Sequence, residues 1–240
     1  MLKNKKFDKS KINKAEYELF DSLSAEWWDE NGKFKVLHQI RPIRIQYILN
    51  QLKDLDLKNI KILDLGCGGG LVSESLSRLG AKVTGIDFVA NNINIARHHS
   101  IKSKLKIDYI HGDIEKIKMN KKFDLIIMFE ILEHVNNWKK LLLKIDKNLK
   151  KDGKIIISTI NRNLISKFTA IYLAESILKW IPKGTHRFEK FIKPEEIEVC
   201  LKKNHYALEN IKGLEFNPLN YSWMLSENTK INSFCTFKKN

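Results

Sequence analysis

The chain has 240 residues, with 43 Lys and Arg against 28 Asp and Glu, and a formal net charge of +15. A content of 43% hydrophobic and 30% charged residues excludes intrinsic disorder, and 11 Gly with 4 Pro exclude a collagen-like or Pro-rich chain. The three cysteines, Cys67, Cys200 and Cys235, form no Cys-x-x-Cys pair, which excludes a zinc knuckle or a dithiol motif and indicates a reducing compartment.

The first elements along the chain are predicted to be helical. Residues 1–12 are polar, lack the apolar core of a secretory signal, and are predicted to be disordered. Over 13–28, apolar side chains recur at three- and four-residue spacing, which predicts a helix. A second helix is predicted to start near Pro42, because proline suits a first turn. Residues 13–55 are therefore expected to form an N-terminal helical cap.

Residues 56–160 alternate between apolar strand patterns and helices. Strands are predicted at 60–65, 81–87, 107–111, 123–129 and 154–159, with helices at about 71–79, 89–102 and 137–149. Strands with apolar cores that alternate with helices are typical of a parallel sheet covered on both faces. The pattern predicts an α/β fold with a doubly wound, mostly parallel sheet.

The pattern changes after residue 160. Helices are predicted at 163–180 and 194–203, and strands near 205–214 and 233–238. We expect residues 163–194 to form a lid or insertion and 195–240 to complete the sheet. Because the chain has no internal repeat and no low-complexity linker, 1–240 is predicted to be a single domain.

A glycine loop is the first chemical signal. The sequence Asp64-Leu65-Gly66-Cys67-Gly68-Gly69-Gly70 follows a predicted buried strand, and Asp87 ends the next strand, where an acid meets ribose hydroxyls in doubly wound sheets. The dinucleotide pattern Gly-x-Gly-x-x-Gly fails because Leu71 stands at the third glycine position. No Lys-Ser/Thr pair follows, so a phosphate-binding P-loop fails as well.

The remaining pattern, Gly-x-Gly-x-Gly preceded by an acid, resembles the nucleotide loop of class I S-adenosylmethionine-dependent methyltransferases. The resemblance implies a class I fold, with Asp64 suited to a cationic sulfonium ligand and Asp87 holding its ribose. Asp113, in His111-Gly112-Asp113, is either an acceptor for the adenine amine or the cap of a loop. Phe129, at the end of a strand, is either a cover for the cofactor or a core aromatic.

Several longer blocks resemble the ubiquinone biosynthesis O-methyltransferase family over about residues 15–220. They are Phe20-Asp21-Ser22-Leu23-Ser24-Ala25-Glu26-Trp27-Trp28-Asp29, the Arg41-Pro42-Ile43-Arg44 region, Glu130-Ile131-Leu132-Glu133-His134, and Pro182-Lys183-Gly184-Thr185-His186. The resemblance implies both O-methylation steps of ubiquinone synthesis, on 3-demethylubiquinol and on 2-polyprenyl-6-hydroxyphenol.

The same resemblance implies individual residue roles. Arg44 would bind the carboxylate of S-adenosylmethionine through a charge-assisted fork, although an Arg on a capping helix is more often a solvated charge. Gly66 would open the cofactor loop, and Asp87 would hold the ribose. Phe129 stands where the family usually has Met, which keeps an apolar cover but removes any role specific to sulfur.

Glu130, Glu133 and His134 are the candidate catalytic residues, because they follow the fourth predicted strand at the ligand-binding edge. They are predicted to hold Mg²⁺, which would lower the pKa of a catechol and orient it. The alternatives are a hydrogen-bonded cluster that shapes the pocket, or a general base among the three. Imidazole is a less typical ligand of Mg²⁺, which leaves the choice open.

Residues 163–181 are apolar on nearly every side of a helix, so they form either a core helix or a lid for a polyprenyl substrate. With Lys167, Lys179, Lys183 and Arg187, residues 163–187 are predicted to contact the cytoplasmic face of the inner membrane. The few Arg residues argue against nucleic acid. The net positive charge is either compositional drift or functional, and the sequence leaves this choice open. Association with other ubiquinone-biosynthesis proteins is also left open.

Two other functions compete with this interpretation. One is a methyltransferase of another small phenol, and the other is a binding protein that holds a ligand without turnover. The presence of Gly66, Asp87 and the group Glu130, Glu133 and His134 argues against the binding protein.

Overall fold

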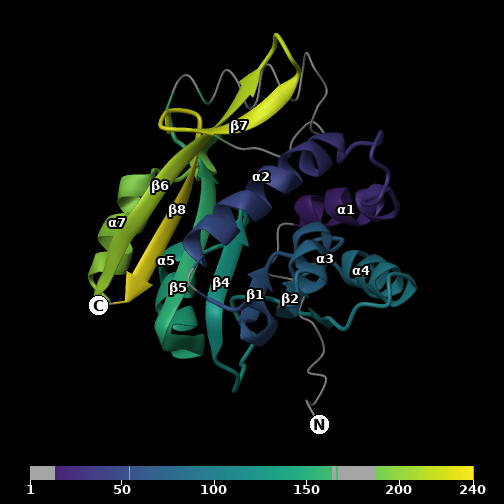
Figure 1. Ribbon diagram of the computed structural model, residues 1–240, viewed down its shortest axis with the longest axis horizontal. Coiled ribbons are helices and arrows are strands. Elements are labelled where there is room, and N and C mark those ends of the chain that lie inside the picture. The colour runs from purple at the N-terminus through teal and green to yellow at the C-terminus, as the bar shows by residue number, and fades with distance from the viewer. Residues whose placement is uncertain (1–13, 54, 164–165, 167–187, 240) are drawn as a thin grey trace.

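The computed structural model describes residues 14–53, 55–163, 166 and 188–239. Helices and strands alternate through the centre of the chain, and the C-terminal part is mainly strand (Figure 1). The α-helices are α1 (Lys14–Leu23), α2 (Lys35–Gln51), α3 (Leu71–Arg78), α4 (Ala90–Lys102), α5 (Trp138–Ile145) and α7 (Pro194–Lys202). The strands are β1 (Lys61–Leu65), β2 (Lys82–Asp87), β3 (Asp108–His111), β4 (Phe123–Phe129), β5 (Leu149–Ile160), β6 (Tyr206–Asn217), β7 (Ser222–Ser226) and β8 (Asn232–Lys239).

The strands form one sheet in the order β3-β2-β1-β4-β5-β8-β6-β7. Pairing is parallel from β3 to β5, whereas β5 with β8, β8 with β6, and β6 with β7 pair antiparallel. The doubly wound, mostly parallel sheet is therefore confirmed. Because β1, β2 and β4 are parallel, Leu65, Asp87 and Phe129 all end at one edge of the sheet, which we call the carboxyl edge.

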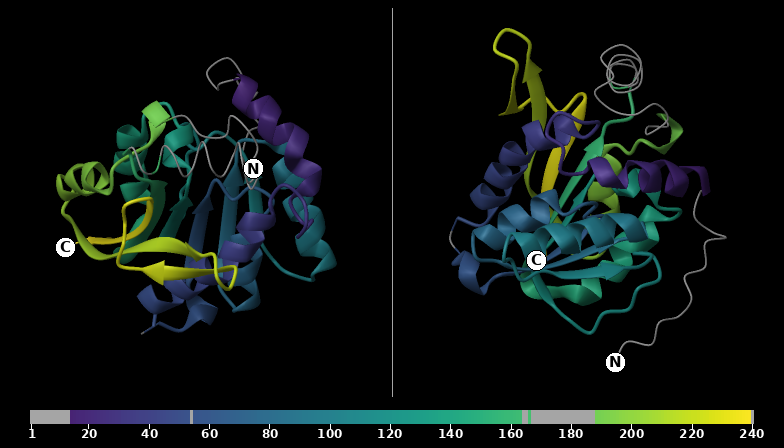
Figure 2. Two further views of the ribbon diagram at one scale, coloured as in Figure 1. Left: turned by 90° about the horizontal axis from the view of Figure 1, so that it is seen from above. Right: turned by 90° about the vertical axis from the view of Figure 1, so that its right-hand side faces the viewer.

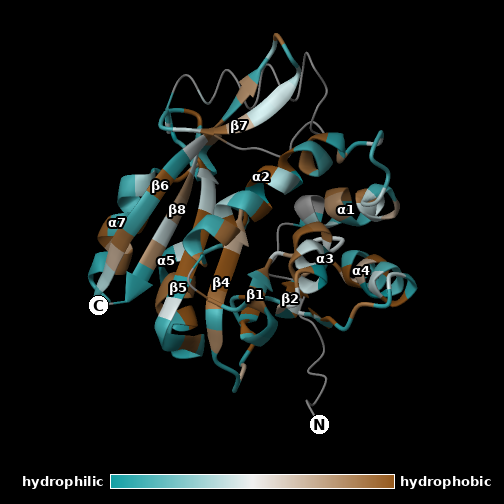
Figure 3. Ribbon diagram, in the orientation of Figure 1, coloured by the Kyte–Doolittle hydropathy of each residue, from teal (hydrophilic) through white to brown (hydrophobic). Residues whose placement is uncertain are grey.

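Helices cover both faces of the sheet (Figure 2). One apolar cluster packs α5 and α7 against the sheet through residues such as Leu142, Ile197 and Met128. A second cluster packs α2 and α3 on the sheet through residues such as Ile48, Leu76 and Ile127. The strands carry apolar residues on both faces because both faces are buried, and the hydropathy colouring shows brown along β4 (Figure 3).

The structure differs from the sequence prediction at three elements. Helix α2 begins at Lys35 rather than near Pro42, and Pro42 lies inside it. Proline removes one helical hydrogen bond, but α2 is held on the sheet by buried side chains that include Tyr47 and Ile48. Strand β5 begins at Leu149 rather than at the predicted residue 154, and its pairing with β4 shifts register between Leu149 and Lys154. Strand β7 was not predicted.

Parts of the predictions fall outside the described residues. They are the disorder of residues 1–12 and nearly all of the helix at 163–180. Among the described residues, none of the helices combines the length and the apolar character needed to cross a bilayer.

Candidate active site

A cavity of ≈ 250 Å³ opens at the carboxyl edge of the sheet, where doubly wound sheets bind their ligands. Residues from the N-terminal cap, the glycine loop and the ends of β2 and β4 line it. Of the predicted site residues, the cavity wall contains Arg44, Gly66, Asp87, Phe129, Glu130 and His134. The structure thus brings together side chains that lie up to 90 positions apart in the chain, whereas Glu133 and Asp113 are outside this lining.

The glycine loop is shaped by its neighbours. Gly66 has φ +76°, and a Cβ there would lie 2.7 Å from Cδ1 of Ile131. Gly68 has φ +53°, and a Cβ there would lie 2.4 Å from the ring of Trp27. Both positions need a residue that tolerates positive φ and carries no side chain, which is the reason for glycine in this loop.

Asp87 binds the glycine loop directly. One oxygen of its buried carboxylate accepts a hydrogen bond from the backbone N–H of Gly68 at 2.9 Å. The other accepts from the N–H of Val89 at 2.8 Å and from Nδ2 of Asn92 at 3.2 Å. Burial raises the pKa of Asp87, and these hydrogen bonds oppose the rise. A carboxylate has about four lone-pair sites, so one remains for a ligand hydroxyl.

Asn92 links Asp87 to the N-terminal cap, a connection that the sequence did not predict. Its Oδ1 accepts hydrogen bonds from Nε1 of Trp27 and from Oγ of Ser24, each at 2.8 Å. Trp27 therefore lies on the glycine loop and is oriented by a residue that also holds Asp87. The paired tryptophans in the sequence were a signal for this region, but no pattern pointed to Asn92.

Asp64 lies on β1, two residues before Gly66, and lines the cavity. Its carboxylate is buried and accepts a hydrogen bond from Oγ of Ser73 at 2.6 Å. Burial raises its pKa to about 6, while the hydrogen bond from Ser73 and the charge of Arg44 act in the opposite direction. A carboxyl with this pKa is readily ionised by a cationic ligand in the cavity.

Arg44 is buried and forms an ion pair with Glu130 across the cavity. The other carboxylate oxygen of Glu130 accepts from Oγ of Ser158 at 2.6 Å. The guanidinium of Arg44 also lies 5.1 Å from the ring centre of Phe129, at cation–π distance. Arg44 is thus not a solvated charge, and its Nε has no hydrogen-bond partner among the described residues.

Glu130, Glu133 and His134 do not converge on one point, contrary to the prediction of a shared metal site. Glu133 is buried, and its Oε1 accepts from Oγ1 of Thr159 at 2.7 Å and from N of Ile160 at 3.1 Å. Among the described residues, no group of three His, Cys, Asp or Glu side chains is arranged to hold a metal ion. The physical reason is that Glu133 points back to β5 while Glu130 pairs with Arg44.

Glu133 therefore stabilises the short helix Leu132–His134 against β5, and burial raises its pKa. His134, at the end of that helix, lies on the cavity wall with its ring 5.6 Å from that of Phe20. Only Glu130 and His134 of the predicted catalytic residues face the cavity.

The cofactor contact predicted for Asp113 has no support in the geometry. Its carboxylate accepts from the N–H of Glu115 at 2.9 Å and forms an ion pair with Lys116 at 3.0 Å. These contacts fit the alternative in which Asp113 caps a loop. Phe88, which directly follows Asp87, lines the cavity instead and was missed, although its position next to the predicted acid was a usable signal.

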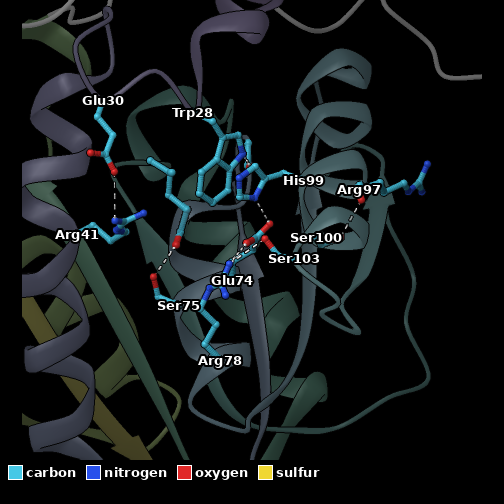
Figure 4. Close-up of polar contacts among 12 residues, drawn as sticks. Trp28, Glu30, Arg41, Glu74, Ser75, Arg78, Arg97, His99, Ser100 and Ser103 are labelled. Atoms are coloured by element: carbon cyan, nitrogen blue, oxygen red, sulfur yellow. Dashed lines mark hydrogen bonds and ion pairs between the residues drawn. The ribbon is translucent and has the colours of Figure 1, made fainter.

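A second network holds the glycine loop from outside the cavity (Figure 4). The indole N–H of Trp28 donates to the carbonyl of Gly69 at 3.0 Å, and its ring stacks on His99 with the ring centres 3.4 Å apart. Nδ1 of His99 lies 2.7 Å from the buried carboxylate of Glu74, which also pairs with Arg78. Trp28 therefore ties the N-terminal cap to both α3 and α4.

Much of the cavity lining is apolar. Its apolar side chains include Phe20, Leu23, Phe34, Leu37, Ile40 and Trp223. A lining that combines three carboxylates and one guanidinium with many apolar side chains suits a cationic ligand beside a hydrophobic one.

These residues fit S-adenosylmethionine, which has a sulfonium, an ammonium, a carboxylate and a ribose. Asp64 and Asp87 offer negative charge, Asp87 keeps an acceptor site for a hydroxyl, and the unpartnered buried Nε of Arg44 can donate to a carboxylate. A divalent metal, in contrast, does not fit the side chains as they are placed.

The comparisons with known proteins agree with this chemistry. A family model described as a methyltransferase domain matches residues 36–211. The ubiquinone biosynthesis O-methyltransferase of Pelagibacter ubique (strain HTCC1062) is 48% identical over 237 residues, which cover 95% of this chain and 99% of that protein. The ubiquinone biosynthesis O-methyltransferase of Rickettsia bellii (strain OSU 85-389) is 39% identical, over 96% of this chain and 98% of that protein.

Solved structures give the fold alone. Magnesium protoporphyrin IX methyltransferase from Synechocystis PCC 6803 with bound SAH superposes with a TM-score of 0.68 at 16% identity, over 95% of this chain and 99% of that chain. The PH0226 protein from Pyrococcus horikoshii OT3 superposes with a TM-score of 0.63 at 19% identity. Both likenesses support the class I methyltransferase fold.

Proposed function

The chain belongs to the ubiquinone biosynthesis O-methyltransferase family, and from this premise we propose that its cavity transfers a methyl group to a phenolic hydroxyl of a polyprenylated ring. Its cofactor is S-adenosylmethionine, which supplies a methyl group on a positively charged sulfur. The family acts in both O-methylation steps of ubiquinone synthesis. The observation that supports this substrate best is that charged and apolar side chains line one cavity.

Three residues hold the cofactor in this proposal. Asp87 accepts from the ribose, Asp64 faces the cationic part, and Arg44 donates to the carboxylate. Gly66 allows close approach to the backbone, and Phe129 covers the site as an apolar wall. Most of the rate comes from holding donor and acceptor in line, since proximity and orientation are large terms in two-reactant chemistry.

His134 or Glu130 accepts the phenol proton. Both face the cavity, and both are residue types that act as general bases. Glu133 has a positioning role, because its hydrogen bonds to β5 hold the short helix that carries His134. Glu130, Glu133 and His134 do not converge on one point, so the proposed reaction uses these side chains without a metal.

The test is methyl transfer from labelled S-adenosylmethionine to a short-chain prenyl catechol, with and without EDTA. Turnover supports the proposal, and binding without turnover would favour a pure binding protein. H134Q and E130Q should each lower kcat, by about a hundredfold for the residue that is the base. A catechol without a prenyl chain distinguishes the proposed substrate from the alternative, another small phenol. Equal kcat/KM for the two catechols would indicate the alternative.

Residues 163–187 are proposed to contact the cytoplasmic face of the inner membrane through Lys167, Lys179, Lys183 and Arg187. A liposome flotation assay tests this contact. Removal of these charges and of Trp180 should weaken binding to anionic vesicles, and unchanged binding would exclude the lid. Association with other ubiquinone-biosynthesis proteins is a further proposal, which co-purification tests.

A further inference from the structure

The hairpin of β6 and β7 carries a group of exposed apolar side chains at its tip. The two strands pair from Gly213 with Ser226 to Asn217 with Ser222, and we call residues 216–224 the hairpin tip. Leu219 is 94% exposed, Tyr221 77% and Met224 44%. Of the eight large hydrophobic side chains that are exposed in the described part of the chain, these three lie within six positions, and the other five are scattered.

The hairpin tip also lacks charge. Residues 216–226 contain no Asp, Glu, Lys, Arg or His, although 30% of the chain is charged. A solvent-exposed turn normally carries polar or charged side chains, and the brown colour at the end of this hairpin stands out against its teal surroundings (Figure 3). An apolar tip without charge is therefore a feature that solubility alone does not account for.

Strand direction places the hairpin tip beside the cavity. β6 is antiparallel to β8, and β8 is antiparallel to β5, so β6 runs in the same direction as β5 and ends at the carboxyl edge. The hairpin projects beyond the body of the protein at this edge (Figure 2). The hairpin tip and the cavity therefore lie at the same end of the molecule.

Aromatic side chains connect the tip to the cavity wall. The ring centre of Tyr221 lies 5.6 Å from that of Phe216, which lies 5.1 Å from that of Trp223. Trp223 lines the cavity, and its indole N–H donates to Oε1 of Gln39 on α2 at 3.4 Å. Ring contacts thus run without a break from Tyr221 at the exposed tip to Trp223 on the cavity wall.

We propose that the hairpin tip inserts into the surface of a lipid bilayer and thereby places the mouth of the cavity against the membrane. This inference rests on the proposed function, because a polyprenylated substrate resides in lipid. Tyr and Trp are the side chains that favour the membrane–water interface, and Leu and Met favour the hydrocarbon below it. Three side chains are too few for a stable protein interface, which uses about 20 residues or more on each side.

A fluorescent probe at the tip tests the insertion. All three native cysteines are buried, so L219C gives a single accessible thiol for an environment-sensitive dye. When neutral phosphatidylcholine vesicles are added, the fluorescence emission of the dye at position 219 should move to shorter wavelength and become more intense. I101C is the matched control, because Ile101 is 75% exposed on α4, and its dye should not shift. No shift at position 219 would overturn the proposal, whether or not the protein binds the vesicles.

A second pair of variants measures the effect on affinity. L219S/Y221S should lower the partition coefficient on phosphatidylcholine vesicles by about tenfold or more, since two apolar side chains lose their burial. I101S/V199S removes two exposed apolar side chains on α4 and α7 and should leave partition unchanged. Equal partition of L219S/Y221S and the wild-type protein would contradict the proposal.

Turnover of the short-chain prenyl catechol, which needs no vesicles, separates this inference from the function on which it rests. L219S/Y221S should turn over that catechol at the wild-type rate in the absence of vesicles. Failure of the wild-type protein to methylate it would contradict the proposed function, while the dye shift would still report on insertion. If the emission of the dye at position 219 is already at shorter wavelength without vesicles, and moves back to longer wavelength on dilution, the tip self-associates. That result would overturn the membrane as the partner.

Discussion

Asp64 carries a carboxyl in the apolar interior, and burial raises its pKa to about 6 from an ordinary value of 3.8. In the absence of cofactor, the folded protein therefore holds this proton over a pH range in which the unfolded chain has lost it. The free energy of unfolding should fall as pH rises from about 4 to about 6 and stay at the lower value above that range. The difference corresponds to about 3 kcal/mol at most.

D64N removes the ionisable group but keeps an oxygen that can accept from Ser73. We expect D64N to be more stable than the wild-type protein in urea at pH 8, and the two to converge near pH 4. If the wild-type protein is instead more stable in urea than D64N at pH 8, the charge of Asp64 is already compensated in the free protein. D64N should bind S-adenosylmethionine less tightly than the wild-type protein, which calorimetry measures.

Asp87 and Asp113 form a matched pair for the cofactor site, because both were predicted to bind the cofactor and only Asp87 lines the cavity. D87A should weaken the affinity for S-adenosylmethionine by about tenfold to a hundredfold, since it removes a charged acceptor and releases the Gly68 N–H. D113N should leave that affinity within about twofold, because its contacts are local. Similar losses for both variants would place the adenine near Asp113 after all.

At the scale of elements, the glycine loop and the N-terminal cap depend on each other. G68A should lower the free energy of unfolding by about 2 kcal/mol or more, because alanine at φ +53° is strained and its Cβ meets the ring of Trp27. G69A isolates the second cause, since Gly69 faces the same ring without a positive φ. G112A is the control, because its nearest contact is a flexible side-chain end at 3.3 Å. Urea unfolding and cofactor calorimetry of the three variants test this dependence, and equal stability of G68A and G112A would contradict it.

The elements also show where sequence patterns suffice. The strands that carry Asp64, Asp87 and Phe129 were predictable, because buried parallel strands have continuous apolar runs with a loop motif at their ends. The start of helix α2 and the whole of strand β7 were not predictable in this way. The start of α2 depends on its packing against the sheet, and Pro42 gave a misleading local signal. Strand β7 is short and half-exposed, and its apolar run is only the three residues Trp223, Met224 and Leu225.

The residues of the candidate active site also fall into those that the sequence predicts and those that it does not. The acids and glycines are set by local motifs, so sequence reasoning found them. Contacts that join distant segments, such as Asn92 with Trp27 or Glu133 with Thr159, depend on side-chain directions that no spacing rule gives. For that reason the three predicted metal ligands were close in the sequence without converging in the structure.

At the scale of the whole molecule, parallel strands separate two kinds of surface. The cavity and the hairpin tip lie at the carboxyl edge, whereas a cleft of ≈ 870 Å³ lies at the opposite edge, where β1 and β2 begin. Seven lysines line that cleft: Lys61, Lys82, Lys104, Lys106, Lys121, Lys122 and Lys150. A bilayer held by the hairpin tip therefore faces away from this concentration of positive charge.

This separation predicts how membrane binding responds to salt. Surface charges are screened as the Debye length falls from about 14 Å at 0.05 M salt to about 4 Å at 0.5 M salt, whereas burial of apolar side chains is not weakened by salt. Partition of the protein onto phosphatidylcholine vesicles should therefore stay constant across this range. On vesicles with added phosphatidylglycerol, any extra binding should disappear at the higher salt, and it should survive L219S/Y221S if it comes from Lys167, Lys179, Lys183 and Arg187. Binding that needs anionic lipid and vanishes entirely with salt would instead make charge the sole membrane contact, and the +15 of the chain would then be functional rather than compositional.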